Sequence, residues 1–168
     1  MRFYGAIQMN SMISLVKDAL IQLPNVARFF GLLHCTSTYL FSSFNAHGSS
    51  MLPTLNPSGD VLIIEHISPR IGQIRYGDIL CVQSPENPLK FLTKRVTGVE
   101  GDEITYLPAS SRSGITKTIT VPKGHIWIQG DNMYSSRDSR HYGPIPFGLV
   151  HGRVVLRVWP PSGFGTLN

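Results

Sequence analysis

Cysteine is scarce in this chain of 168 residues, and the usual metal-binding spacings are absent. Cys35 and Cys81 are too few for a disulfide framework, and they form no CxxC pair. The six histidines form neither an HxH nor an HExxH pair. Protein metal centres normally draw their ligands from such clusters. We therefore expect no metal site.

Acidic residues are also few. Ten Asp and Glu stand against 15 Lys and Arg, which gives a net charge of +5. A nucleic-acid-binding protein would be expected to gather its basic residues in a stripe interleaved with aromatic ones. Here the basic residues are scattered, so we predict no nucleic-acid partner. We assign the excess charge to solvated surface and to the flanks of a targeting or membrane segment.

A long apolar run is missing as well. From Phe29 to Phe44 there is no acidic or basic residue except His34, yet the stretch is short and rich in Ser and Thr for a membrane span of about 20 residues. Before it, apolar residues recur at helical spacing. We predict an amphipathic N-terminal segment over 1–27 and an uncleaved helical membrane anchor over 28–46. A buried or interfacial helix is the alternative.

After this stretch the sequence takes on the character of a β-protein. Short segments rich in β-branched residues recur, and Gly-, Pro-, Asn- and Asp-containing turns separate them. This spacing predicts a mainly β domain over 47–160, built as an antiparallel sheet or a partly closed barrel. Within it we expect 103–121 to form a hairpin, and after it 161–168 to form a short tail.

The segment from Gly48 to Leu55, with the sequence GSSMLPTL, places Ser50 in a setting that suits a nucleophile. Small residues beside Pro53 predict a turn, which would expose the hydroxyl and leave backbone N–H groups free to face an oxyanion. Most turns of this composition carry no chemistry. The octamer alone is therefore only a candidate site.

A serine nucleophile needs a base that removes its proton, and Lys94 is the candidate. Alternation along 91–96 puts Lys94 on the same strand face as Leu92 and Val96, while Arg95 points to the other face. Burial disfavours an ammonium group, so we expect the pKa of Lys94 to fall from about 10.4 to about 8. An amine with that pKa can act as a base.

Three motifs occur in order along the chain: SMLPT from Ser50 to Thr54, KRV from Lys94 to Val96, and GDN from Gly130 to Asn132 with SRDSR from Ser136 to Arg140. Together they resemble the membrane-bound signal peptidases that use a Ser-Lys dyad. The resemblance covers about residues 28–158, and it implies a signal-peptidase-like β fold, serine endopeptidase activity and no cofactor. The short segment between the second and third motifs leaves no room for the large second β-domain of some bacterial relatives.

The resemblance also implies roles for single residues. Ser50 would attack the scissile carbonyl, Lys94 would accept its proton, and Ser136 would orient the Lys94 amine. The backbone N–H of Ser50 would contribute to the oxyanion site. Some bacterial relatives supply a second oxyanion donor from a serine two residues before the nucleophile, where this chain has Gly48. The residues implied to brace the third motif are Asp131, Asp138 and Arg140, and those implied to line substrate pockets are Met51 and Leu52.

Two longer phrases, KRVTGVEGD from Lys94 and VPKGHIWIQGDN from Val121, are most similar to a mitochondrial branch of this family. That similarity implies precursor polypeptides with sorting signals as substrates. It also implies the inner mitochondrial membrane as the location, with the catalytic domain facing the intermembrane space. A homologous second peptidase subunit would be the partner in a heterodimer.

Other interpretations stay open. The chain could be a bacterial-type or plastid signal peptidase, or a non-catalytic scaffold subunit of the same fold. A self-cleaving repressor is disfavoured because the chain has no recognisable helix-turn-helix. A Ser-His-Asp triad would combine Ser50 with His125 or His141 and with Asp131 or Asp138.

Overall fold

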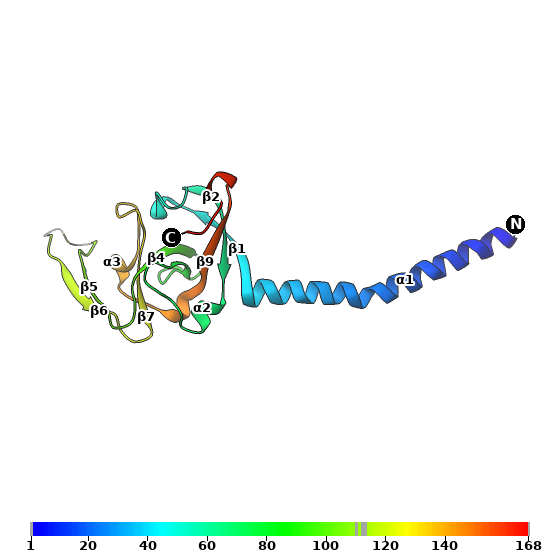
Figure 1. The fold of residues 1–168 in the computed structure, drawn as a ribbon, viewed down its shortest axis with the longest axis horizontal. Helices are drawn as coiled ribbons and strands as arrows, with labels where there is room; N and C mark the ends of the chain where they lie inside the picture. The colour runs from blue at the N-terminus through cyan, green and yellow to red at the C-terminus, as the bar shows by residue number, and fades with distance from the viewer. Residues whose placement is uncertain (1, 110, 112–113, 168) are drawn as a thin grey trace. The chain divides into compact units, whose positions relative to one another are not determined.

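The structure, a computed structural model, describes residues 2–109, 111 and 114–167, and for residues 2–16 it describes the backbone only. The chain divides into two compact units, one ending at Thr38 and the other beginning at Tyr39. Figure 1 shows a long helix in the first unit and a β-rich fold in the second.

The first unit is helical throughout its described length. Helix α1 (Arg2–Cys35) contains Pro24, and its side chains from Lys17 onward are exposed. A π-helical turn, η1 (Thr36–Leu40), follows it. No helix in the described part of the chain is both long and apolar enough to cross a membrane.

The N-terminal elements begin and end differently from the predicted segments. Helix α1 runs unbroken across the border expected between 1–27 and 28–46, and residue 1 lies outside the described residues. The last residues of the expected anchor form strand β1 (Phe41–His47), which pairs with strand β2. The reason is a two-residue period, because Phe44 and Ala46 pack on the core while the residue between them stays exposed.

The second unit is built on a seven-stranded antiparallel sheet, which confirms the prediction of a mainly β domain. The strand order is β1-β2-β9-β3-β4-β7-β8, and most of these strands can be followed in Figure 1. Because β1 and β8 are the ends of this order, the described sheet is not a closed barrel. The remaining elements of this sheet and the helices beside it are β2 (Ser58–Glu65), α2 (Ile67–Arg70), β3 (Ile79–Gln83), β4 (Phe91–Gly98), β7 (His125–Gln129), α3 (Ser139–Tyr142), β8 (Ile145–Pro146) and β9 (Val150–Trp159).

A separate hairpin occupies the segment predicted for one. Strands β5 (Glu103–Tyr106) and β6 (Lys117–Thr120) pair in a two-stranded sheet, and residues 110, 112 and 113 between them lie outside the described residues. The expected tail, 161–168, is partly attached to the domain. It contains the turn η4 (Pro161–Gly163), and Leu167 packs against the core. Residue 168 is outside the described residues.

The core lies on both faces of strand β3. Ile79 and Cys81 belong to one apolar cluster, and Leu80 and Val82 belong to a second. All four side chains are buried, which explains why this strand reads as an unbroken apolar run rather than an alternating one. A strand buried on both faces gives its neighbour β4 a rigid position, and β4 carries the candidate base.

Candidate active site

Ser50 lies in a short 3-10 turn, η2 (Ser49–Met51), directly after the edge strand β1. The turn begins at Gly48, whose φ of 107° is in a region that residues with a Cβ rarely adopt. The N–H of Gly48 donates to the carbonyl of Pro57 at 2.8 Å. Glycine at position 48 thus allows the chain to leave the strand sharply and present Ser50.

Lys94 lies in the middle of strand β4, opposite Leu80 of β3. Its side chain faces the same way as buried Val96, and only 3% of the residue is exposed. Arg95 faces the other way, so the alternation predicted from the sequence is confirmed. Opposed residues of an antiparallel pair point to the same side of the sheet, so Leu80 contributes to the apolar surroundings of Lys94.

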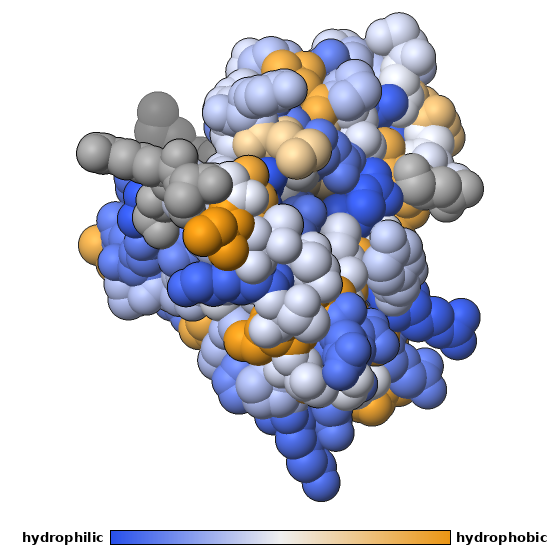
Figure 2. All heavy atoms as spheres, turned by 90° about the vertical axis from the view of Figure 1, so that its left-hand side faces the viewer, coloured by the Kyte–Doolittle hydropathy of each residue, from blue (hydrophilic) through white to orange (hydrophobic). Residues whose placement is uncertain are grey.

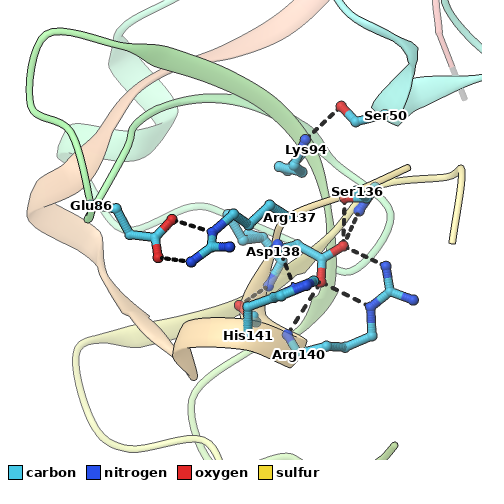
Figure 3. Close-up of polar contacts among 11 residues, drawn as sticks. Ser50, Glu86, Lys94, Ser136, Arg137, Asp138, Arg140 and His141 are labelled. Atoms are coloured by element: carbon cyan, nitrogen blue, oxygen red, sulfur yellow. Dashed lines mark hydrogen bonds and ion pairs between the residues drawn. The ribbon is translucent and has the colours of Figure 1, made fainter. Parts of the chain in front are cut away.

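The structure brings the candidate nucleophile and base into contact. Lys94 Nζ lies 2.6 Å from Ser50 Oγ, as Figure 3 shows, and it also donates to the carbonyl oxygen of Thr93 at 3.1 Å. Burial lowers the pKa of Lys94 to about 8, although the charges of Asp138 and Asp131 act in the opposite direction. A serine hydroxyl beside a partly neutral amine is the arrangement that nucleophilic catalysis requires.

The third motif holds the turn that carries Ser50. The backbone N–H of Asn132 donates to the carbonyl oxygen of Ser50 at 3.0 Å, and its side-chain amide donates to that of Ser49 at 3.1 Å. Gly130 is needed for this approach. A Cβ at that position would lie 2.4 Å from the carbonyl oxygen of Ser50 and 2.3 Å from the hydroxyl of Ser136. The Ser50 turn and the third motif, roughly 80 residues apart in the sequence, are therefore held together by backbone hydrogen bonds and close packing.

Asp131 joins the third motif to the other two. Its carboxylate accepts two hydrogen bonds from Arg95, both at 2.9 Å, and one from the hydroxyl of Thr54 at 2.5 Å. Burial alone would raise the pKa of Asp131, but the bonds from Arg95 and Thr54 outweigh it and lower that pKa. The structural roles of Arg95 and Thr54 were missed from the sequence. Their signal was their position inside the first two motifs.

Asp138 is fully buried and is the most heavily bonded carboxylate near the dyad. Arg140 donates to it from Nε at 2.9 Å and from Nη2 at 2.7 Å, and Gly130 donates its backbone N–H at 3.0 Å. Burial would raise the pKa of Asp138, but these bonds lower it. Asp138 and Arg140, both implied by the resemblance to brace the third motif, thus form an ion pair, which Figure 3 shows.

Ser136 differs from the expectation. Its hydroxyl donates to Asp138 Oδ2 at 2.6 Å, whereas Lys94 Nζ contacts the hydroxyl of Ser50 and the carbonyl oxygen of Thr93. The prediction that Ser136 orients the Lys94 amine by a direct hydrogen bond is therefore wrong for this structure. The physical reason is that the buried carboxylate of Asp138 is a strong acceptor for the hydroxyl proton, whereas a charged lysine offers donors only.

The two residues predicted to line substrate pockets have different surroundings. Met51 is 2% exposed and packs in the core with Leu55 and Leu62, so it has no surface to offer a substrate. The prediction for Met51 is wrong, because the turn points its side chain inward. Leu52 is half-buried and keeps some exposed surface next to Ser50.

The alternative triad is not assembled around Ser50. His125 Nδ1 contacts the carbonyl oxygen of Lys123, and His141 Nδ1 lies 3.4 Å from the backbone nitrogen of Asp138. In the part of the chain that the structure describes, neither imidazole has a hydrogen bond to Ser50. Among the described residues, no group of three His, Cys, Asp or Glu side chains is arranged to hold a metal ion.

Comparison with known proteins is consistent with this site. The family described as "Signal peptidase, peptidase S26" matches residues 23–110 and 108–159. The chain is 49% identical over 152 residues to the mitochondrial ATP-independent inner membrane protease subunit 1a of Arabidopsis thaliana, covering 90% of each chain. It is 43% identical to the mitochondrial inner membrane protease subunit 1 of Xenopus tropicalis, covering 80% of this chain and 79% of the relative. It is 44% identical to the mitochondrial inner membrane protease subunit 2 of Danio rerio, covering 68% of this chain and 62% of the relative.

Proposed function

The chain belongs to the peptidase S26 family of signal peptidases, and on this premise we propose that it is a serine endopeptidase with Ser50 as nucleophile and Lys94 as general base. The observation that carries the assignment is the 2.6 Å contact between Lys94 Nζ and Ser50 Oγ in a buried environment. The pKa of Lys94, lowered to about 8, supports it because only the neutral amine can accept the hydroxyl proton.

The proposed reaction has two stages. Ser50 Oγ attacks the scissile carbonyl while its proton passes to Lys94 Nζ. Collapse of the tetrahedral intermediate breaks the C–N bond, and Lys94 returns the proton to the leaving amine. Water then attacks the resulting ester while Lys94 accepts a proton from it. The bond between the acyl carbon and Ser50 Oγ breaks, and Lys94 returns the proton to Ser50 Oγ. The backbone N–H of Ser50 is proposed as an oxyanion donor.

Two further serine side chains, Ser49 and Ser136, lie close to the dyad but form their hydrogen bonds elsewhere. The hydroxyl of Ser49 is paired with the hydroxyl of Ser135 at 2.6 Å, so it is engaged outside the dyad. Ser136 is proposed to act on Lys94 through Asp138, whose negative charge raises the pKa of that lysine. Ser136 is thus a positioning residue in this proposal.

The substrates are proposed to be precursor polypeptides that carry sorting signals for the mitochondrial intermembrane space. The mitochondrial inner membrane proteases among the relatives support this substrate class and the inner membrane as location. Exposed apolar side chains along helix α1, such as Phe29, Phe30 and Leu33, support an association of that helix with the membrane. The catalytic domain is proposed to face the intermembrane space.

The partner is proposed to be a homologous second peptidase subunit. Relatives named as subunit 1 and as subunit 2 both match this chain, which supports a complex of two related chains. The pairing would be tested by co-purification of this chain with such a subunit from the same membrane.

The central experiment compares purified wild-type protein with Ser50→Ala on peptides that span the sorting-signal junction of candidate precursors. New N-termini are identified by sequencing. We expect cleavage at a single bond by the wild type and none by the variant. Cleavage by Ser50→Ala at the wild-type rate would remove Ser50 as nucleophile.

A further inference from the structure

A pocket of about 540 Å³ lies beside the dyad, and the proposed mechanism does not use it. One wall comes from the β5–β6 hairpin, with Tyr106 and Leu107, and another comes from Met133 and Tyr134 of the third motif's loop. Figure 2 looks at the end of the molecule that carries the hairpin, where hydrophobic and hydrophilic patches lie around a hollow. The pocket is open enough to admit a peptide side chain.

Ser136 connects the pocket to the reaction centre. It lines the pocket, and its hydroxyl lies against Gly130 on the same side as the carbonyl oxygen of Ser50, since both would contact a Cβ at that glycine. Gln129, which also lines the pocket, is the register partner of Arg95, the residue next to Lys94. The pocket therefore begins close to the dyad, not at a remote surface.

The sheet suggests the path of a substrate past the dyad. Strand β7 pairs with β4 at Arg95, Val96 and Gly98, so no described strand pairs with residues 91–94 on that side. An extended peptide can bind there by main-chain hydrogen bonds. Beyond Lys94 that position in the sheet is occupied by β7. A peptide that follows this edge would therefore leave the sheet at Lys94, where Gln129 of β7 lines the pocket.

The chemistry of the pocket favours hydrogen-bond acceptors. Gln129, Arg140 and His141 contribute polar side chains, and none of the described residues that line it is acidic. Asp138, which is bonded to the lining residues Ser136 and Arg140, is fully buried. Within the described part of the chain, Nη1 of Arg140 and the side-chain amide of Gln129 have no hydrogen-bond partner. Amide and carboxylate ends are the groups that such donors bind.

We propose that this pocket is the subsite for the first residues on the C-terminal side of the scissile bond, and that it selects acceptor side chains and disfavours Lys and Arg there. An extended chain advances about 3.3 Å per residue, and we assign the second residue after the cut to this pocket. A basic side chain would meet Arg140 with no free carboxylate to pair with. The inference rests on the proposed peptidase function.

The test uses the purified full-length protein and pairs of peptides that differ only at the second residue after the cut, Gln in one and Lys in the other. We expect wild-type kcat/KM to favour the Gln peptide by about tenfold, because charge repulsion in a partly buried pocket is of that order. Met133→Glu puts a carboxylate on the wall, where Met133 is 68% exposed, and should bring the ratio close to one by improving cleavage of the Lys peptide. Tyr134→Glu provides a second variant with the same expectation.

Ile115→Glu is the matched control, because Ile115 is 66% exposed and does not line the pocket. It adds the same charge and should keep the wild-type ratio. Equal cleavage of both peptides by the wild type would overturn the subsite and leave the peptidase function standing, and so would an equal shift in Ile115→Glu. Absence of cleavage of any peptide by the wild type, matched by Ser50→Ala, would remove the proposed function and the subsite together.

Discussion

Lys94 Nζ and Ser50 Oγ lie 2.6 Å apart, although 44 residues separate them in the sequence. One comes from the buried interior of a sheet and the other from a turn after its edge strand. Removing the lysine charge from water costs folding free energy, and the same cost makes the amine a base. Stability and function are therefore opposed at this residue.

Lys94→Met should abolish cleavage and stabilise the fold. At pH 7 the lysine is charged in both states, and lowering its pKa from 10.5 to about 8 costs the native state about 3 kcal/mol. Loss of its two hydrogen bonds offsets part of the gain, so we expect a net stabilisation of about 1–2 kcal/mol. Urea unfolding at pH 7 measures it.

The pH dependence of that difference provides the control. Between about pH 8 and pH 10.5 the unfolded state binds more protons at Lys94 than the native state, so wild-type stability rises with pH in this window. A methionine at position 94 does not titrate in this window. The excess in free energy of unfolding of Lys94→Met over the wild type should therefore shrink as the pH rises. If Lys94→Met were less stable than the wild type at pH 7, burial of the Lys94 amine would not be the destabilising feature that its lowered pKa implies.

The cleavage rate should rise with pH around the pKa of Lys94. Burial lowers this pKa to about 8, and the neutral amine accepts the Ser50 proton. We expect log kcat/KM to increase with a slope near one below pH 8 and to level off above it. The profile is measured with one peptide under single-turnover conditions, so that product release does not mask the chemistry. A rate that is constant from about pH 6 to pH 9 would exclude Lys94 as base.

Gly130→Ala should inactivate the protein. The added Cβ would lie 2.3 Å from Ser136 Oγ and 2.4 Å from the backbone oxygen of Ser50, so the turn that carries the nucleophile must move. A shift of about 1 Å at a nucleophile can cost on the order of 100-fold in rate. Gly148→Ala is the matched control, because a Cβ there meets nothing within 4 Å. Equal activity of the two variants would show that the close approach at Gly130 is not required.

Asp138→Asn should destabilise the fold strongly at neutral pH. The variant leaves Arg140, whose side chain is only 11% exposed, facing an amide instead of a carboxylate. Breaking a buried pair typically costs about 3–5 kcal/mol. Since the pKa of Asp138 is lowered in the native state, its contribution is present above the unfolded pKa and is lost as pH falls through the native one. The difference from wild type in thermal unfolding should therefore narrow in acid.

Glu86→Gln is the comparison for that variant. Glu86 also accepts two hydrogen bonds from an arginine, Arg137, but both of these side chains are largely exposed. Exposed pairs are screened by water and contribute little. We expect no measurable change in unfolding temperature for Glu86→Gln. A loss as large as that of Asp138→Asn would mean that burial does not decide the strength of these pairs.

The chemistry of the site was readable because it depends on short-range patterns. Alternation in β4 put Lys94 on the apolar face, and its lowered pKa follows from that face alone. The contact of Ser136 with Asp138 was not readable, because two acceptors compete for one hydroxyl and only distances decide. The inward direction of Met51 was missed for a similar reason, since a turn fixes it and no periodic pattern describes a turn.

The sequence by itself determined the β character of the domain, the identity of the three motifs and the face on which Lys94 lies, because strand periodicity and residue chemistry are local properties. Tertiary structure decided the rest. It brought Ser50 and Ser136 together around Gly130, although roughly 80 residues separate Ser50 from the other two. It also turned the end of the expected anchor into the edge strand β1, and it formed a pocket between the β5–β6 hairpin and the loop of Met133 and Tyr134. Such arrangements depend on which distant surfaces pack together. In this fold they pack on the two faces of β3, and no local sequence pattern specifies those contacts.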